Sequence, residues 1–62
     1  MVVDEYKKIL ELMLQDKTNE EISIELNYSR STVKRRIKEL FKKYNVDSRI
    51  KLMQEYLMER LT

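Results

Sequence analysis

The chain contains neither glycine nor proline, and this absence constrains its fold more than any other feature of the 62 residues. Proline breaks a helix from inside, and glycine is the usual residue of sharp turns. Uninterrupted helices are therefore favoured, and the sharp turns must be made by Asn, Asp, Ser or Lys. Cysteine and histidine are also absent, which excludes disulfides and the usual zinc sites. So short a chain must gain stability from helix packing and self-association.

The spacing of apolar residues predicts four helices. The first runs from Asp4 to Gln15, with Tyr6, Ile9, Leu10 and Met13 on one face. The other three are a short helix after Thr18, a long one over 30–44 and a last one over 49–61. We therefore expect an all-α fold, a four-helix domain that spans residues 1–62.

Capping residues stand where these helices should begin and end. The run Thr18-Asn19-Glu20-Glu21 fits a capping box, in which the Thr and Glu side chains accept from each other's backbone N–H groups. Ser29 and Ser48 are suitable caps for the third and fourth helices. Asn45 can end the third helix, because asparagine tolerates the left-handed conformation of a helix C-terminus.

Charge is strongly segregated along the chain, although the net charge is only +2. The segment 29–51 holds nine basic residues against Glu39 and Asp47, a net charge of +7, and the remainder therefore carries −5. A uniformly solvated surface would mix its signs. Segregation of this kind is typical of a surface that binds a polyanion.

The third predicted helix is apolar on one face and basic on the other. Its inner face holds Val33, Ile37, Leu40, Phe41 and Tyr44. Its outer face holds Ser31, Arg35, Lys38 and Lys42, and Lys34 and Arg36 lie on the flanks. A short capped helix, a tight turn and a basic helix form a helix–turn–helix, which can place its second helix in a DNA major groove. The alternative is an ordinary solvated face, and the capped helix upstream favours DNA. Buried aromatic residues argue against a single-strand or RNA-loop binder.

Several polar residues near the helix starts have two possible roles. Thr18 and Asn19 stand at a helix N-terminus, where backbone N–H groups can receive a phosphate, although Thr18 can also act only as a cap. Thr32 has the same two alternatives. Tyr28 can bond a phosphate, but packing of this turn aromatic into the core is the favoured interpretation.

The fourth predicted helix is apolar around about half of its circumference. A helix that packs against the core of one chain normally uses a narrower apolar stripe than this. A surplus of apolar side chains, around Leu52, Tyr56 and Leu57, should therefore remain exposed. A two-fold dimer would bury this surplus, and a wider core within one chain is the alternative. The predicted dimer interface comprises Leu52, Met53, Tyr56, Leu57 and Arg60.

From Ile9 to Leu57 the chain resembles the LuxR/GerE/NarL-type DNA-binding domain, and its size is most like that of the stand-alone GerE-type members. The resemblance is carried by the run 15–22 and by Leu26, Tyr28-Ser29, Thr32-Val33-Lys34, Lys43, Val46 and Arg49. There are departures. Asp16 replaces a common glycine, and Tyr6 and Lys8 replace two glutamates, so the usual ion partner of Arg49 is missing.

The resemblance implies a third helix that lies in the major groove and a fourth that dimerises. Base contacts are then expected at Lys34, Arg35 and Lys38, two of which the outer face of the helix selects independently. The expected phosphate contacts are Thr18, Asn19, Arg30, Ser31, Thr32, Arg36 and Lys42.

The function expected from these features is that of a bacterial or phage transcription regulator, which binds an inverted repeat in duplex DNA as a homodimer. One alternative is an adaptor or antagonist that heterodimerises through the fourth helix with another regulator. A sigma-factor-like promoter-binding domain is a second. RNA polymerase or a regulatory protein is a further candidate partner. No catalytic motif, cofactor or membrane segment is indicated, and we expect a cytoplasmic, nucleoid-associated protein that is not an enzyme.

Overall fold

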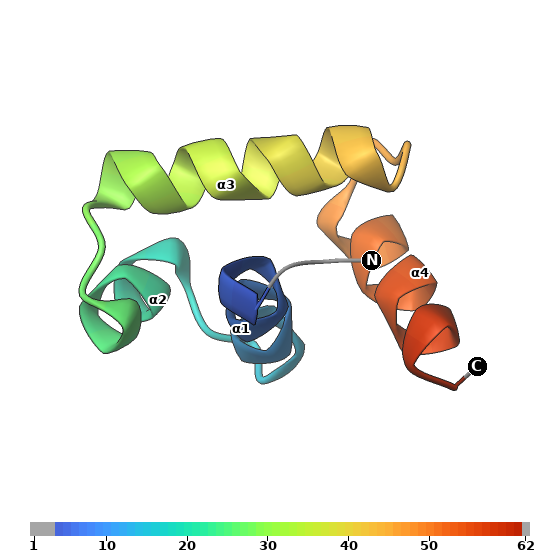
Figure 1. Ribbon diagram of the computed structural model, residues 1–62, viewed down its shortest axis with the longest axis horizontal. Helices are drawn as coiled ribbons and strands as arrows, with labels where there is room; N and C mark the ends of the chain where they lie inside the picture. Colours follow the sequence, from blue (N-terminus) through green and yellow to red (C-terminus); the bar gives the residue numbers. More distant parts are fainter. Residues whose placement is uncertain (1–3, 62) are drawn as a thin grey trace.

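The computed structural model describes residues 4–61, and these residues form four α-helices and no strand. In Figure 1, α3 lies across the other three helices, so that one long side of α3 faces away from the rest of the molecule. The all-α fold of four helices is confirmed. Their bounds are α1 Asp4–Leu14, α2 Asn19–Leu26, α3 Arg30–Lys43 and α4 Arg49–Leu61.

Within the described part of the chain, α1, α2 and α3 all end in the same backbone motif. One or two residues past each helix end the chain adopts a left-handed conformation, at Asp16 (φ 63°), Asn27 (φ 58°) and Asn45 (φ 54°). The next N–H then bonds a carbonyl five residues back, which is the Schellman arrangement. These bonds are Lys17 to Leu12 at 3.1 Å, Tyr28 to Ser23 at 2.9 Å and Val46 to Phe41 at 3.0 Å. Asn and Asp thus make the turns that the glycine-free sequence requires.

Replacing Asp16 with glycine is expected to raise the free energy of unfolding by about 0.5–1 kcal/mol. Glycine removes the steric cost of the left-handed conformation, and this gain exceeds the extra entropy that glycine adds to the unfolded chain. Urea denaturation measures the change. Gln15→Gly is the control, because Gln15 is not among the residues with positive φ and the same substitution should destabilise there. A less stable Asp16→Gly variant would contradict this account.

The core lies where α3 crosses the other helices, and every helix contributes to it. Six side chains are almost completely shielded from solvent: Ile9, Leu10, Ile22, Val33, Leu40 and Leu52. Phe41 and Tyr44 pack against them from α3, as does Tyr28 from the turn before it. The predicted inner face of α3 and the core position of Tyr28 are therefore confirmed.

The fourth helix is attached to the rest of the fold at its first residue and again near its middle. Arg49 donates from Nη2 to the carbonyl oxygen of Lys17 at 2.7 Å, so a backbone acceptor holds the arginine whose usual ion partner is missing. Further along α4, the Tyr56 hydroxyl donates to the Glu11 carboxylate on α1. Burial, together with this carboxylate, raises the pKa of Tyr56 to about 12. No helix within residues 4–61 has the length and hydrophobicity needed to cross a membrane.

The expectation that Leu52 and Tyr56 belong to an exposed apolar surplus is wrong. Leu52 is completely buried and Tyr56 almost so, because both lie on the side of α4 that packs into the core of the same chain. Met53 is also partly buried against this core. Leu57, the third residue of the expected surplus, is exposed, and the other exposed apolar side chains of α4 are Ile50, Met58 and Leu61.

Candidate nucleic-acid interface

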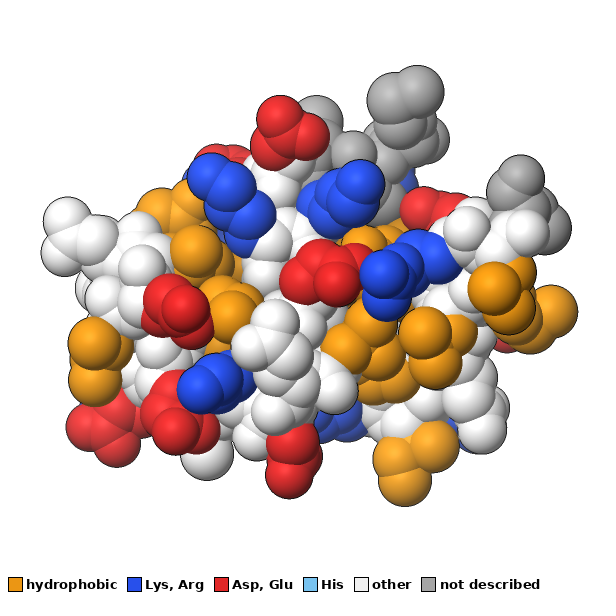
Figure 2. Space-filling model, turned by 90° about the horizontal axis from the view of Figure 1, so that it is seen from below, with side chains coloured by type: hydrophobic (Ala, Val, Ile, Leu, Met, Phe, Trp, Pro, Cys, Tyr) orange, Lys and Arg blue, Asp and Glu red, His pale blue; other side chains and the backbone are white. Residues whose placement is uncertain are grey.

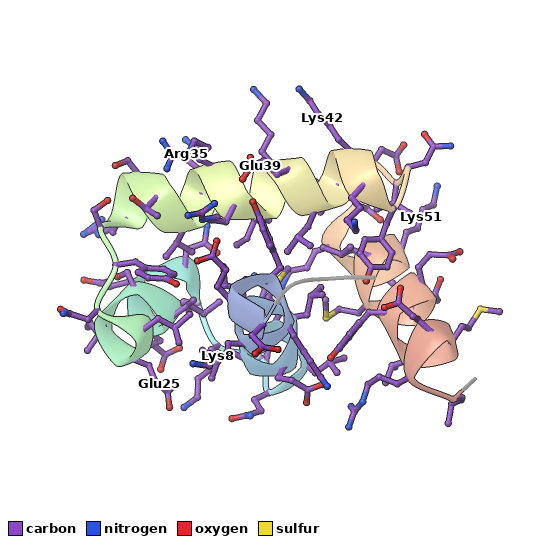
Figure 3. All side chains as sticks on the ribbon, viewed as in Figure 1. Lys8, Glu25, Arg35, Glu39, Lys42 and Lys51 are labelled. Atoms are coloured by element: carbon purple, nitrogen blue, oxygen red, sulfur yellow. The ribbon has the colours of Figure 1, made fainter. Side chains whose placement is uncertain are left out.

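The outer side of α3 presents a row of exposed cations. Lys34, Arg35, Lys38 and Lys42 are all exposed, and so is Ser31, about one turn before Lys34. Figure 3 shows Arg35 and Lys42 extending from the side of α3 that faces away from the other helices. Within the described residues, none of these four cations forms an ion pair with a carboxylate. Their charge is therefore available to a ligand.

One flank of this row opens into a hollow of about 350 Å³. Asn19 borders it from α2, Lys34 and Lys38 from α3, and Arg49 from α4, over an apolar floor of Met13, Ile37 and Phe41. Two predicted base contacts and one predicted phosphate contact therefore meet at one place. Arg49 joins them, although the sequence analysis did not assign it to the site.

The opposite flank of α3 is acidic, and there the structure differs from expectation at Arg36. The Arg36 guanidinium lies 3.1 Å from Glu5 and 3.8 Å from Glu39, and it donates to the Tyr6 hydroxyl at 3.0 Å. It also lies over the Tyr6 ring, 5.3 Å from the centroid. The Tyr6 bond and the Glu5 charge raise the pKa of Arg36.

These contacts direct Arg36 toward α1, so a phosphate could be bound only by displacing carboxylates. The Tyr6 hydroxyl in turn donates to Glu39 at 2.8 Å, which holds a carboxylate on this flank. The expectation of Arg36 as a freely available phosphate contact therefore does not fit its surroundings. The two flanks of α3 differ in charge, and the cationic surface extends toward α2 and the start of α4.

The start of α2 is closed by the predicted capping box. The Thr18 hydroxyl accepts from the Glu21 N–H at 3.1 Å, and the Glu21 carboxylate accepts from the Thr18 N–H at 2.8 Å. The same bond lowers the pKa of Glu21. Thr18 is thus a structural cap, while Asn19 beside it is exposed. A phosphate contact at either residue stays a prediction.

The start of α3 is capped in a similar way by Ser29. Its hydroxyl accepts from the Thr32 N–H at 3.1 Å and lies 2.8 Å from the Thr32 hydroxyl, which gives Thr32 a part in the cap. Arg30 lies 3.6 Å from Glu20, but both side chains are mostly exposed. Such an exposed pair is weak, so Arg30 can exchange Glu20 for a phosphate.

The remaining surface differs in character from the outer side of α3. The face opposite α3 mixes acidic, basic and hydrophobic side chains without a continuous field of one sign (Figure 2). On α4, the exposed fractions are 72% for Ile50, 42% for Leu57, 63% for Met58 and 86% for Leu61. Ile50, Leu57 and Leu61 follow helical spacing and form one outward stripe, with Met58 beside it. We call these four residues the α4 stripe.

Sequence reasoning missed two features of this site. One is the network that links α1 to α3 and comprises Glu5, Tyr6, Arg36 and Glu39. It joins residues about thirty positions apart in the sequence, so no local sequence pattern predicts it. The other is Arg49, which lies within the basic segment 29–51 and is one of the residues that carry the family resemblance, but neither signal assigns it to the interface. Which way its side chain points depends on how α4 packs.

Comparison with known proteins agrees with this geometry. The GerE family model, described as bacterial regulatory proteins of the luxR family, matches residues 6–56. Searches of curated proteins and of solved structures returned no significant match. The match covers most of the chain, including all of α2 and α3. The chain therefore belongs to the luxR family of bacterial regulatory proteins, whose GerE-type helix–turn–helix domain serves in DNA binding and transcription regulation.

Proposed function

We propose that the protein is a sequence-specific regulator that binds duplex DNA as a homodimer. The observation that carries this proposal is the exposed row Lys34, Arg35, Lys38 and Lys42 on α3. These four cations form no ion pair with a carboxylate among the described residues, and they lie along one helix. A polyanion that accepts a helix is the ligand that this arrangement fits.

The dimensions of α3 suit a major groove. Its 14 residues span about 21 Å, and the groove is about 12 Å wide. In this arrangement Lys34, Arg35 and Lys38 donate to the N7 and O6 acceptors of guanine. Lys42, Asn19 and the cap residues contact the phosphates on either side, which set the register of the helix.

The α4 stripe supports the homodimer. A small protein rarely leaves such an apolar surface uncovered, and a two-fold axis beside α4 would bury it against the same stripe of a second copy. Two α3 helices related in this way predict an inverted repeat, with half-sites one helical turn or about 34 Å apart.

Salt dependence of DNA binding tests the proposal directly. Fluorescence anisotropy with a duplex of mixed sequence should show an affinity that falls steeply with salt, with a slope of about −0.9 for each phosphate neutralised. The double variant Arg30→Gln/Lys42→Gln, which removes two of the expected phosphate contacts, should reduce the magnitude of this slope by about 1.8. Lys7→Gln/Lys8→Gln removes the same charge from exposed positions of α1 and should leave the slope unchanged.

Two results would contradict this function. One is the absence of duplex binding by the wild-type protein, and the other is an equal effect of the two double variants. The first result would favour the second candidate, an adaptor that heterodimerises with a larger regulator. The α4 stripe also fits that role, because a stripe on a different protein could cover it.

A further inference from the structure

The five arginines of the chain fall into two groups according to their partners. Arg30, Arg36 and Arg60 each lie within 4.0 Å of a carboxylate, that of Glu20, Glu5 or Glu11 respectively. Arg35 and Arg49 have no such partner within residues 4–61. Arg35 lies on the outer side of α3, where the proposed function already uses it. Arg49 is thus an arginine with an uncompensated charge and no assigned ligand.

The surroundings of Arg49 hold its guanidinium close to the proposed interface. Its bond to the Lys17 carbonyl occupies one Nη2 donor, and the other donors of the planar group are not used in bonds to described residues. Lys17 directly precedes Thr18, the cap of α2, so Arg49 is attached to the segment that also positions Asn19. Burial of part of the side chain further limits its freedom.

Arg49 borders the same hollow as Asn19, Lys34 and Lys38. A neutral acceptor such as a carbonyl fixes a guanidinium without cancelling its charge, whereas a carboxylate does both. Three cations from α3 and α4 therefore converge with an amide side chain at the N-terminus of α2. A tetrahedral anion with several oxygens can accept hydrogen bonds from all of these groups at once.

We propose that Arg49 contacts a DNA backbone phosphate from α4, beside the flank of α3 that carries Lys34 and Lys38. This inference rests on the proposed function, since it needs DNA along α3. It assigns to α4 a part in DNA binding in addition to dimerisation. The helix that pairs two copies then also touches the DNA that each copy binds.

The test is the salt dependence of duplex binding by Arg49→Gln, measured by fluorescence anisotropy with the mixed-sequence duplex. Loss of one phosphate contact should reduce the magnitude of the log–log slope by about 0.9. Arg49→Lys keeps the charge and should keep the slope. Lys7→Gln is the matched control, because it removes the same charge from an exposed position on α1 outside the proposed interface, and its slope should equal that of the wild type.

A purely structural role gives a different result. If Arg49 only holds α4 to the Lys17 carbonyl, Arg49→Gln lowers the melting temperature and weakens binding equally at every salt concentration. An unchanged slope overturns the inference. Wild-type protein that binds no duplex at all would instead overturn the proposed function.

A measurement on the wild-type protein avoids the risk that Arg49→Gln does not fold. With 15N-labelled arginine, the Nε–H signals of Arg35 and Arg49 should shift when the duplex is added. The signals of Arg36 and Arg60, whose guanidinium groups are bound by carboxylates, should move less. A stationary Arg49 signal beside a shifted Arg35 signal would rule out the contact.

Discussion

Leu57→Glu is expected to convert the protein to monomers and to weaken operator binding about 10²- to 10⁴-fold. Leu57 lies within the α4 stripe and is 42% exposed, so a carboxylate can be tolerated in the monomer. In a two-fold dimer the same carboxylate would be buried near its symmetry mate without a partner. The loss is large because the second half-site is bound at the effective concentration that dimerisation provides. Sedimentation equilibrium and anisotropy with a selected inverted repeat measure the two effects.

The control is Ile24→Glu, which places the same charge on α2 at a side chain that is 75% exposed. This variant should stay dimeric and should bind the operator nearly as wild type does. Tyr56→Glu is unsuitable as a test, because Tyr56 is buried and its substitution would disrupt the core. A wild-type protein that is monomeric at micromolar concentration would exclude the homodimer.

Arg35→Ala is expected to weaken binding to the selected operator by about 1–3 kcal/mol while sparing binding to random duplexes. The Arg35 side chain extends from the outer side of α3 and forms no ion pair with described residues. An arginine in this position can donate two bonds to one guanine, and a wrong base leaves those donors unsatisfied. Competition between operator and random duplexes at fixed salt gives the specificity ratio.

Lys42→Ala provides the comparison for Arg35→Ala. As a phosphate contact, Lys42 should contribute similarly on every sequence, so its removal should weaken both duplexes alike and reduce the salt slope by about 0.9. If Arg35→Ala weakens the affinity for the operator and for random duplexes equally, Arg35 contacts phosphate and does not contact a base.

The helices and their ends follow from local sequence. The capping box at Thr18 and Glu21 is complete within four residues, and Ser29 caps α3 through groups at most three residues away. The left-handed Asn45 ends α3 because its own conformation closes the bonds of the last turn. Such features depend on neighbours in the chain, so spacing and residue type were sufficient to predict them.

It was harder to predict from the sequence which side chains lie in the core, which are exposed and which form ion pairs. Arg36 stands on a basic helix, yet Glu5 and Tyr6 on α1 engage it because α1 crosses α3 at that point. Leu52 and Tyr56 belong to an apolar helix whose buried side is set by the angle at which α4 docks. Periodicity states which residues share a face of a helix, but not which face meets which neighbour.

By itself, the sequence determined four helices, their caps and one helix that is apolar inside and basic outside. Hydrogen bonds within a few residues and the 3.6-residue repeat control all of these features. Only the tertiary structure decided that the cationic surface extends to one flank of α3, with Arg49 and Asn19 on that side and Glu5 and Glu39 on the other. The packing of the helices determines which charged residues, far apart in the sequence, lie close together in space. The electrostatics of the site depend on these contacts.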